Sequence, residues 1–168
     1  MNMAELWQLP VLFCCENNRY AMGTAIDREL SQVDLIAKAE AYRVPAASAD
    51  GMDVVDSHAA MQRAVEHIRT KGGPFFLEFR TYRFRPHSMF DPELYRDKAE
   101  VAEWRDEHDP IRMFTERCLA ENLLTAEEVA GIEAAVAVEV AEAVAYAEAG
   151  TLESVDTLTH NVMTPVRS

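Results

Sequence analysis

The chain has 168 residues, 49% of them hydrophobic, and a net charge of −13 because 29 acidic side chains outnumber 16 basic ones. This length suits one domain or a large piece of one, with enough apolar residues for a packed core. The negative charge argues against a general binder of nucleic acid or of anionic membranes. We expect no membrane insertion, because no apolar segment is long enough to span a bilayer and the first residues lack the pattern of a signal peptide.

The chain opens with a helix end that leads into a strand. Residues 1–8 are predicted to form the last turns of a helix whose Leu6 and Trp7 face inward, and Pro10 ends it. The apolar run 11–15 suits a strand buried on both faces of a parallel sheet. Its Cys14 and Cys15 are therefore expected to be buried thiols, and three cysteines without framework spacing indicate a reducing compartment. A domain that starts on a helix end looks cut, so we expect further sequence upstream.

Polar residues follow this strand, and Asn17, Asn18 and Tyr20 are among them. In open α/β sheets, ligands bind just beyond the carboxyl ends of the strands. Amide and backbone carbonyl oxygens suit Mg²⁺ or Ca²⁺. Two asparagines are also typical of a plain loop, because Asn tolerates turns and left-handed backbone, and spacing alone favours that interpretation.

Two further strand-helix units are predicted. Residues 25–31 are polar and irregular, residues 33–42 have helical spacing, and residues 46–49 form a short strand. Asp53 is the expected N-cap of a helix over 54–70, which ends at the Gly72-Gly73-Pro74 segment before a third strand over 75–82. Strands and helices alternating at these lengths imply right-handed crossovers, so the predicted fold class is α/β, with a parallel sheet flanked by helices.

The loop after the third strand, residues 83–91, is basic in an otherwise acidic chain. Arg83, Arg85, His87 and Ser88 lie within six positions and offer the fixed charge, forked donors and hydroxyl that a phosphate group needs. A surface loop whose arginines pair with nearby acids explains the pattern equally well. Segments 17–22 and 83–88 both follow the carboxyl ends of strands, so they can meet at one end of the sheet. A Mg²⁺-diphosphate cofactor fits that pairing.

The remaining residues are predicted to be mainly helical. One helix covers 98–107, a second begins at Asp109-Pro110, and a long alanine-rich helix runs from the capping box at 125–128 to about 149. Its stripe of Ile132, Val136, Val140 and Val144 is expected to be a packing face. We therefore predict part of an α/β cofactor-binding domain at 1–92, a helical extension packing on it at 93–150, and a tail without assigned structure at 151–168.

Two segments carry a family resemblance. CENNRYAMGT at 15–24 and TYRFRPHSMFDP at 81–92 closely resemble the α subunit of thiamine-diphosphate-dependent 2-oxoacid dehydrogenases, specifically of the pyruvate dehydrogenase E1 component. ADGMD at 49–53 and the Tyr95-Arg96 pair also match. The resemblance runs from Asn2 to about the long helix and implies a thiamine-diphosphate-binding fold that is incomplete at its N-terminus.

The resemblance implies roles for the residues of the first motif. Asn18 would give its side-chain oxygen, and Tyr20 its backbone carbonyl, to Mg²⁺. Met22 would lie under the bend of thiamine diphosphate and hold its V shape.

The resemblance also implies roles in the second motif. His87 would bind near the diphosphate and act at the reacting centre, with Arg83 supporting the cofactor loop. In animal relatives the serine that matches Ser88 is a regulatory phosphorylation site, where added negative charge would disorder a diphosphate site. Two departures stand out. The family's His-Gly-His-Ser is Arg-Pro-His-Ser at 85–88, and the family's Gly-Asp-Gly motif, whose aspartate is a metal ligand, would lie upstream of residue 1.

The activity and partners follow from the same resemblance. The complete enzyme would decarboxylate pyruvate or a related 2-oxoacid on thiamine diphosphate and reductively acylate the lipoyl group of E2. Its expected partners are the E1 β subunit, a chain supplying the missing N-terminal half, and the lipoyl-bearing E2, in an oligomer of the bacterial cytoplasm or, in a eukaryote, of the mitochondrial matrix. The isolated chain is expected to be inactive. Two alternatives stay open: a truncated, non-catalytic dimerisation or interaction module, and a branched-chain oxoacid or acetoin dehydrogenase α subunit.

Overall fold

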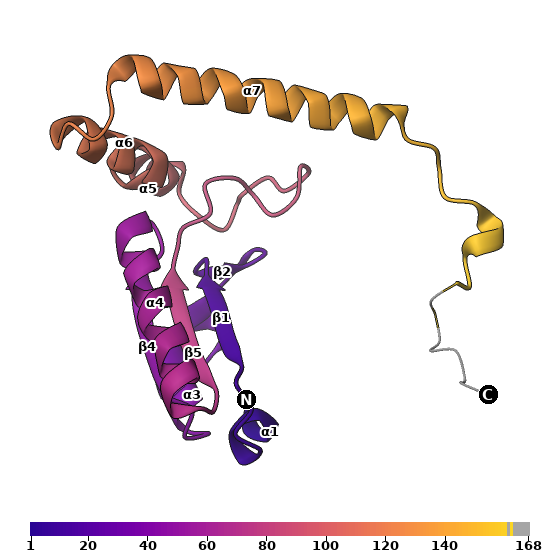
Figure 1. The fold of residues 1–168 in the computed structure, drawn as a ribbon. Helices are drawn as coiled ribbons and strands as arrows, with labels where there is room; N and C mark the ends of the chain where they lie inside the picture. The colour runs from indigo at the N-terminus through magenta and orange to yellow at the C-terminus, as the bar shows by residue number, and fades with distance from the viewer. Residues whose placement is uncertain (161, 163–168) are drawn as a thin grey trace. The chain divides into compact units, whose positions relative to one another are not determined.

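The computed structural model describes residues 1–160 and 162, and it divides the chain into two units, residues 1–120 and 121–168 (Figure 1). The first unit holds the sheet and the candidate site. The second unit holds one long helix and the tail. The tail predicted at 151–168 lies partly outside the described residues, and its described part contains a short 3-10 helix, η1 (Val155–Thr157).

Three parallel strands form the main sheet of the first unit. They are β1 (Leu12–Asn17), β4 (Ala46–Asp50) and β5 (Phe75–Arg80), in the spatial order β1-β5-β4. Leu12 pairs with Phe75 and Asn17 with Arg80, so β1 and β5 run side by side over their full length. The predicted α/β class with a parallel sheet is confirmed, and the last strand along the chain is the central one.

Helices cover both faces of this sheet (Figure 1). On one face, Ala60 and Ala64 of α4 (Val54–Lys71) pack against Leu77, and on the other, Ala39 of α3 (Leu35–Glu40) packs near Phe76. Successive residues of a strand point to opposite faces, so Leu77 packs in the core on the α4 side and Phe76 in the core on the α3 side. Two alanines spaced four residues apart let α4 lie close to the sheet.

The predicted start and end of α4 agree with the structure, whereas the helix predicted over 33–42 is the shorter α3, Leu35–Glu40. The Asp53 side chain accepts hydrogen bonds from the backbone N–H groups of Val55 and Asp56 at the start of α4. The helix ends at Gly72, whose φ of 74° is a left-handed conformation that favours glycine.

Two predictions about the first strand and the helix before it are wrong. In α1 (Asn2–Leu6), Ala4 is the buried residue, while Leu6 and Trp7 are 71% and 59% exposed. β1 is an edge strand, and α4 packs mainly on β4 and β5. Cys14 pairs with Leu77, so its side chain lies on the same face of the sheet as α4. Because α4 does not cover this edge strand, Cys14 is exposed. Cys15 faces α3 and is half-buried.

A hairpin follows β1, and the segment 25–31, predicted to be irregular, contains a short helix. Strands β2 (Tyr20–Ala21) and β3 (Thr24–Ala25) pair antiparallel and lead into the short helix α2 (Ile26–Glu29). Met22, in the two-residue turn between them, has a φ of 56°. These strands were not predicted from the sequence, because a two-residue strand is too short to show a hydrophobic period.

The helices of the C-terminal part begin where predicted. α5 (Lys98–His108) and α6 (Pro110–Ala120) belong to the first unit, and Asp109 accepts from the N–H groups of Ile111 and Arg112 at the start of α6. α7 (Ala126–Ala149) belongs to the second unit and starts with the predicted capping box. The four residues of its apolar stripe are 52–57% exposed, and their packing stays a prediction. Among the described residues, no helix has the length and apolar character needed to cross a membrane.

Candidate functional site

A cavity of about 510 Å³ lies where the turn after β1 meets the loop after β5. Its lining consists of Asn18, Tyr20, Ala21, Met22, Arg83, Arg85, His87, Tyr95 and Arg96. β1 and β5 are neighbouring parallel strands, so their carboxyl ends reach the same edge of the sheet. The structure thus brings together the two segments that the sequence analysis paired, with Asn18 and His87 in one cavity, while their individual roles stay predictions.

The two neighbouring asparagines, Asn17 and Asn18, make different contacts. The Asn17 side chain donates to Glu78 Oε1 at 2.7 Å and accepts from the Arg19 N–H at 3.1 Å. Asn18 Oδ1 accepts from the Thr81 hydroxyl at 2.8 Å. An amide oxygen has two lone pairs, so Asn18 keeps one for a further donor or a metal ion. Asn17 therefore holds the turn to the sheet, and Asn18 is the asparagine that the cavity can use.

Left-handed backbone marks this turn. Arg19 and Met22 have φ values of 65° and 56°. Non-glycine residues rarely adopt this conformation, and where they do, the surrounding structure has to stabilise it. Met22 is 65% exposed at the rim of the cavity, so its side chain is accessible to a ligand.

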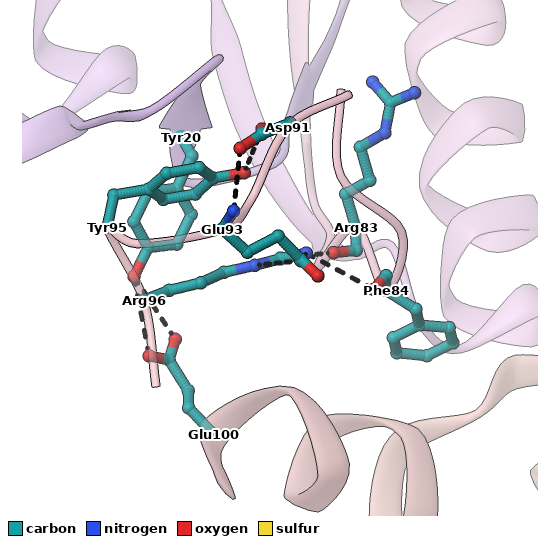
Figure 2. A network of polar contacts seen from close by, with 8 residues as sticks. All are labelled: Tyr20, Arg83, Phe84, Asp91, Glu93, Tyr95, Arg96 and Glu100. Carbon is teal, nitrogen blue, oxygen red and sulfur yellow. Dashed lines mark hydrogen bonds and ion pairs between the residues drawn. The ribbon is translucent and has the colours of Figure 1, made fainter. Parts of the chain in front are cut away.

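Arg96 binds the backbone of the basic loop, as Figure 2 shows. Its guanidinium donates to the backbone carbonyls of Arg83 at 2.6 Å and Phe84 at 3.3 Å, and it pairs with Glu93. Burial by itself would lower the pKa of Arg96, but the hydrogen bonds that it donates to Glu93, together with the charge of Glu93 and the interaction with Tyr82, raise the pKa above its usual value. No role for Arg96 followed from local sequence, because the backbone carbonyls that it binds lie 12 and 13 residues away.

Tyr95 anchors the same loop. Its hydroxyl donates to Asp91 at 3.0 Å (Figure 2). Burial and then this hydrogen bond raise the pKa of Tyr95. The Tyr95-Arg96 pair was the available signal for both residues, since it forms part of the family resemblance.

The cavity is cationic. Three guanidinium groups, from Arg83, Arg85 and Arg96, line it, and its lining contains no carboxylate. Among the described residues, neither Arg83 nor Arg85 forms an ion pair, which speaks against a loop whose arginines simply pair with local acids. Arg96 is paired with Glu93, whereas the forked donors of Arg83 and Arg85 have no local counter-ion within the described residues and suit a phosphate or diphosphate group.

His87 is in contact with Arg83. Arg83 Nη1 lies 3.2 Å from His87 Nδ1, and because a guanidinium only donates, Nδ1 is the acceptor. A neutral His87 in this contact carries its proton on Nε2. Ser88 does not line the cavity. Its exposed hydroxyl accepts from the Phe90 N–H at 3.3 Å.

Aromatic residues lie between the turn and α5. Tyr82 stacks on Trp104 with ring centres 5.1 Å apart, and the Arg19 guanidinium lies 4.3 Å from the centre of the Trp104 ring. The Tyr82 hydroxyl is buried, and burial raises the pKa of Tyr82 to about 12, with Glu100 adding to the effect.

The metal-ligand set on this chain is incomplete. No group of three or more His, Cys, Asp or Glu side chains in the described part of the chain could hold a metal ion. The Asn18 amide oxygen and the Tyr20 carbonyl are hard ligands of the right kind for Mg²⁺, which takes about six oxygen ligands. The residues present therefore fit a diphosphate well and a magnesium ion only in part.

The fold and the site define an α/β protein with a cationic cavity, lined without a carboxylate, at the carboxyl edge of its parallel sheet. Residues 1–155 match the family described as Dehydrogenase E1 component, and the chain belongs to this family. The predicted family resemblance is thereby confirmed.

Curated relatives agree with this assignment. The chain is 46% identical over 132 residues to the pyruvate dehydrogenase E1 component subunit alpha of Rhizobium meliloti (strain 1021), covering 79% of this chain and 38% of that protein. It is 42% identical over 128 residues to the corresponding protein of Zymomonas mobilis, covering 76% of this chain and 36% of the relative. The somatic, mitochondrial form of Homo sapiens is 39% identical over 133 residues, with coverage of 79% and 34%. The chain thus matches little more than a third of the length of these relatives.

Proposed function

We propose that this chain is part of a thiamine-diphosphate-dependent E1 α subunit that decarboxylates pyruvate and reductively acylates the lipoyl group of E2. The observation that carries the proposal is the cavity that joins Asn18 and Tyr20 to His87 and three arginines. Its support from the comparisons is the family itself, together with relatives whose names specify pyruvate dehydrogenase.

Each residue has a part in the proposal. Asn18 and Tyr20 are ligands of Mg²⁺, and Met22 lies under the bend of thiamine diphosphate. Arg83 and His87 bind at the diphosphate end, and His87 also exchanges protons at the reacting centre. When bound, thiamine diphosphate supplies the electron sink for decarboxylation, and the protein supplies position and charge.

The proposed partners are an E1 β subunit and the lipoyl-bearing E2, in an assembly of the bacterial cytoplasm. Two neutral oxygen ligands without a carboxylate hold a magnesium ion weakly, even with phosphate and water oxygens to complete its shell, so we expect the isolated chain to bind thiamine diphosphate weakly and to be inactive.

Binding to the isolated chain is the first test. Purified protein is titrated with Mg²⁺ and thiamine diphosphate in a calorimeter, and its melting temperature is recorded alongside. We expect no saturable signal. Tight binding by this chain alone would show that the residues lining the cavity suffice for binding and would overturn the expectation of weak binding.

Activity after co-expression with the proposed partners is the second test. We expect turnover of pyruvate in preference to branched-chain oxoacids and acetoin. His87→Asn should lower kcat about 100-fold, the usual contribution of a positioned proton carrier. His58→Asn, on the exposed side of α4 and outside the cavity, is the matched control and should leave kcat unchanged. Equal rates for the two variants would remove His87 from the chemistry.

A further inference from the structure

The turn that carries Asn18 is attached to α5 by two consecutive side chains. The Arg19 guanidinium lies 4.3 Å from the centre of the Trp104 ring. The Tyr20 hydroxyl lies 3.4 and 3.5 Å from the two carboxylate oxygens of Glu100 (Figure 2). Glu100 and Trp104 are four residues apart on one helix, so they lie on the same face one turn apart. One face of α5 therefore contacts both residues that follow Asn18.

Tyr82 holds Trp104 in place. The two rings are stacked with an angle of 4° between their planes, and Tyr82, two residues beyond the end of β5, is only 4% exposed. Tyr82 also meets Tyr20 edge to face, with ring centres 6.5 Å apart. Trp104 thus packs on a buried side chain next to the sheet, and this packing restricts the Arg19 side chain that lies over it.

The turn needs such support. Arg19 has a φ of 65°, which a non-glycine residue keeps only where its surroundings stabilise it. A cation over an indole ring is a favourable contact of the kind that can do so. Because Arg19 lies between Asn18 and Tyr20, fixing its side chain also restricts the backbone on both sides.

We propose that Trp104 and Glu100 are positioning residues of the site: by holding Arg19 and Tyr20, they keep the turn in the conformation in which Asn18 and Tyr20 line the cavity. What the turn binds rests on the proposed function. The attachment of the turn to α5 does not.

The first experiment measures the turn without any ligand. Hydrogen exchange is followed in peptides covering residues 17–26 of the purified full chain and of its variants. Trp104→Ala should raise exchange in this segment by about 3- to 10-fold, the factor that corresponds to a lost cation–π contact. Trp104→Phe keeps an aromatic face and should restore most of the protection. Trp7→Ala, which removes the exposed tryptophan of α1, is the matched control and should change nothing.

Exchange in α4 and β5 separates positioning from general stability. We expect it to stay unchanged in Trp104→Ala, whereas an equal rise throughout the first unit would make Trp104 a merely structural residue and overturn the proposal. Arg19 is exposed, so Arg19→Gln removes the same contact from the other side without touching the core. It should reproduce the local effect even if Trp104→Ala does not fold, and unchanged exchange in Arg19→Gln overturns the proposal.

Glu100 is tested in the same way. Tyr20→Phe removes the hydroxyl that reaches Glu100 and should raise exchange in residues 17–26, while Glu100→Gln keeps an acceptor for it and should preserve most of the protection. If both variants leave exchange at the wild-type rate, Glu100 has no positioning role.

The co-expressed assembly gives the second readout. There, Trp104→Ala should raise the Mg²⁺ concentration needed for half-maximal activity by about 10-fold, with kcat at saturating Mg²⁺ largely kept, because a displaced turn weakens the metal site more than the chemistry. An unchanged Mg²⁺ requirement would contradict the link to the metal site. An assembly with no thiamine-diphosphate-dependent activity contradicts the proposed function instead, and the exchange data still decide the positioning role.

Discussion

Glu78 is a carboxylate that is only 4% exposed in the central strand β5, and its partners come from two strands. Asn17 of β1 donates to it at 2.7 Å, and Arg80 lies 3.4 Å from its other oxygen. A buried charge destabilises a fold unless hydrogen bonds compensate it. Asn17 therefore contributes to stability, although it belongs to the same sequence motif as Asn18.

Replacing Asn17 should reveal this contribution. Asn17→Ala leaves Glu78 without its amide donor, and we expect the free energy of unfolding to fall by about 1–3 kcal/mol in urea denaturation followed by circular dichroism. Asn2→Ala, at an exposed position of α1, is the control and should stay within about 0.5 kcal/mol of the wild type. Equal effects of the two substitutions would mean that Glu78 does not depend on Asn17.

Tyr82 makes stability depend on pH at the alkaline end. Its pKa is raised to about 12 in the folded chain, above the ordinary value of 10, because burial disfavours the tyrosinate. The unfolded chain therefore loses this proton first. The stabilisation is complete below pH 10 and is lost as the pH rises towards 12.

A substitution isolates this dependence. Tyr82→Phe keeps the ring on Trp104 but has no proton to lose, so its melting temperature should fall less steeply than that of the wild type between about pH 10 and 12. Tyr146→Phe changes a tyrosine that is 86% exposed and should follow the wild-type curve. Parallel curves for wild type and Tyr82→Phe would contradict the assignment.

At the scale of elements, the start of α7 depends on a reciprocal cap. The Thr125 side chain accepts from the Glu128 N–H at 3.2 Å, and a Glu128 carboxylate oxygen accepts from the Thr125 N–H at 2.8 Å. The backbone and side-chain hydrogen bonds from Thr125 lower the pKa of Glu128. This contribution is therefore present above the ordinary pKa of a glutamate and is lost as the pH falls through the lowered one.

Removing the cap should loosen the first turn of α7. Thr125→Ala should cost about 1 kcal/mol of local helix stability, seen as faster hydrogen exchange in residues 126–130. Glu128→Gln keeps the acceptor, so it should preserve the cap at pH 7 and abolish its acid dependence. Thr151→Ala, beyond the end of α7, is the control, and an effect as large as that of Thr125→Ala would exclude a specific cap.

At the scale of the whole molecule, the unpaired edge of strand β1 can affect self-association. β1 pairs with β5 on one side only in the described part of the chain, and Cys14 is exposed on it. An unpaired strand edge can recruit another strand, so we expect self-association that increases with concentration.

A charge on this strand tests the expectation. Cys14→Lys should lower the average mass seen by light scattering at high protein concentration, because a lysine disfavours pairing of strand edges. Reducing agent in all samples excludes disulfide-linked dimers. Val155→Lys adds the same charge in η1 and should have no such effect. A wild-type chain that stays monomeric at every concentration would contradict the prediction.

Local sequence was sufficient to predict most of the elements and the two site segments. A helix cap and the helical spacing that follows it depend on residues within four positions of each other. Caps such as Asp53 and Thr125 can therefore be predicted from the sequence. The meeting of segments 17–22 and 83–88 followed from one further rule, that parallel strands end at a common edge.

Only the tertiary structure decided which strand is central and therefore that Cys14 is exposed. It also decided that Asn17 bonds to Glu78 whereas Asn18 lines the cavity. It also assembled Arg96, Tyr82 and Trp104 around the site. The physical reason is distance along the chain: Asn17 meets Glu78 across 61 residues and Tyr20 meets Glu100 across 80. No periodicity or spacing encodes contacts of that range, because they exist only once the strands have paired and α5 has packed against them.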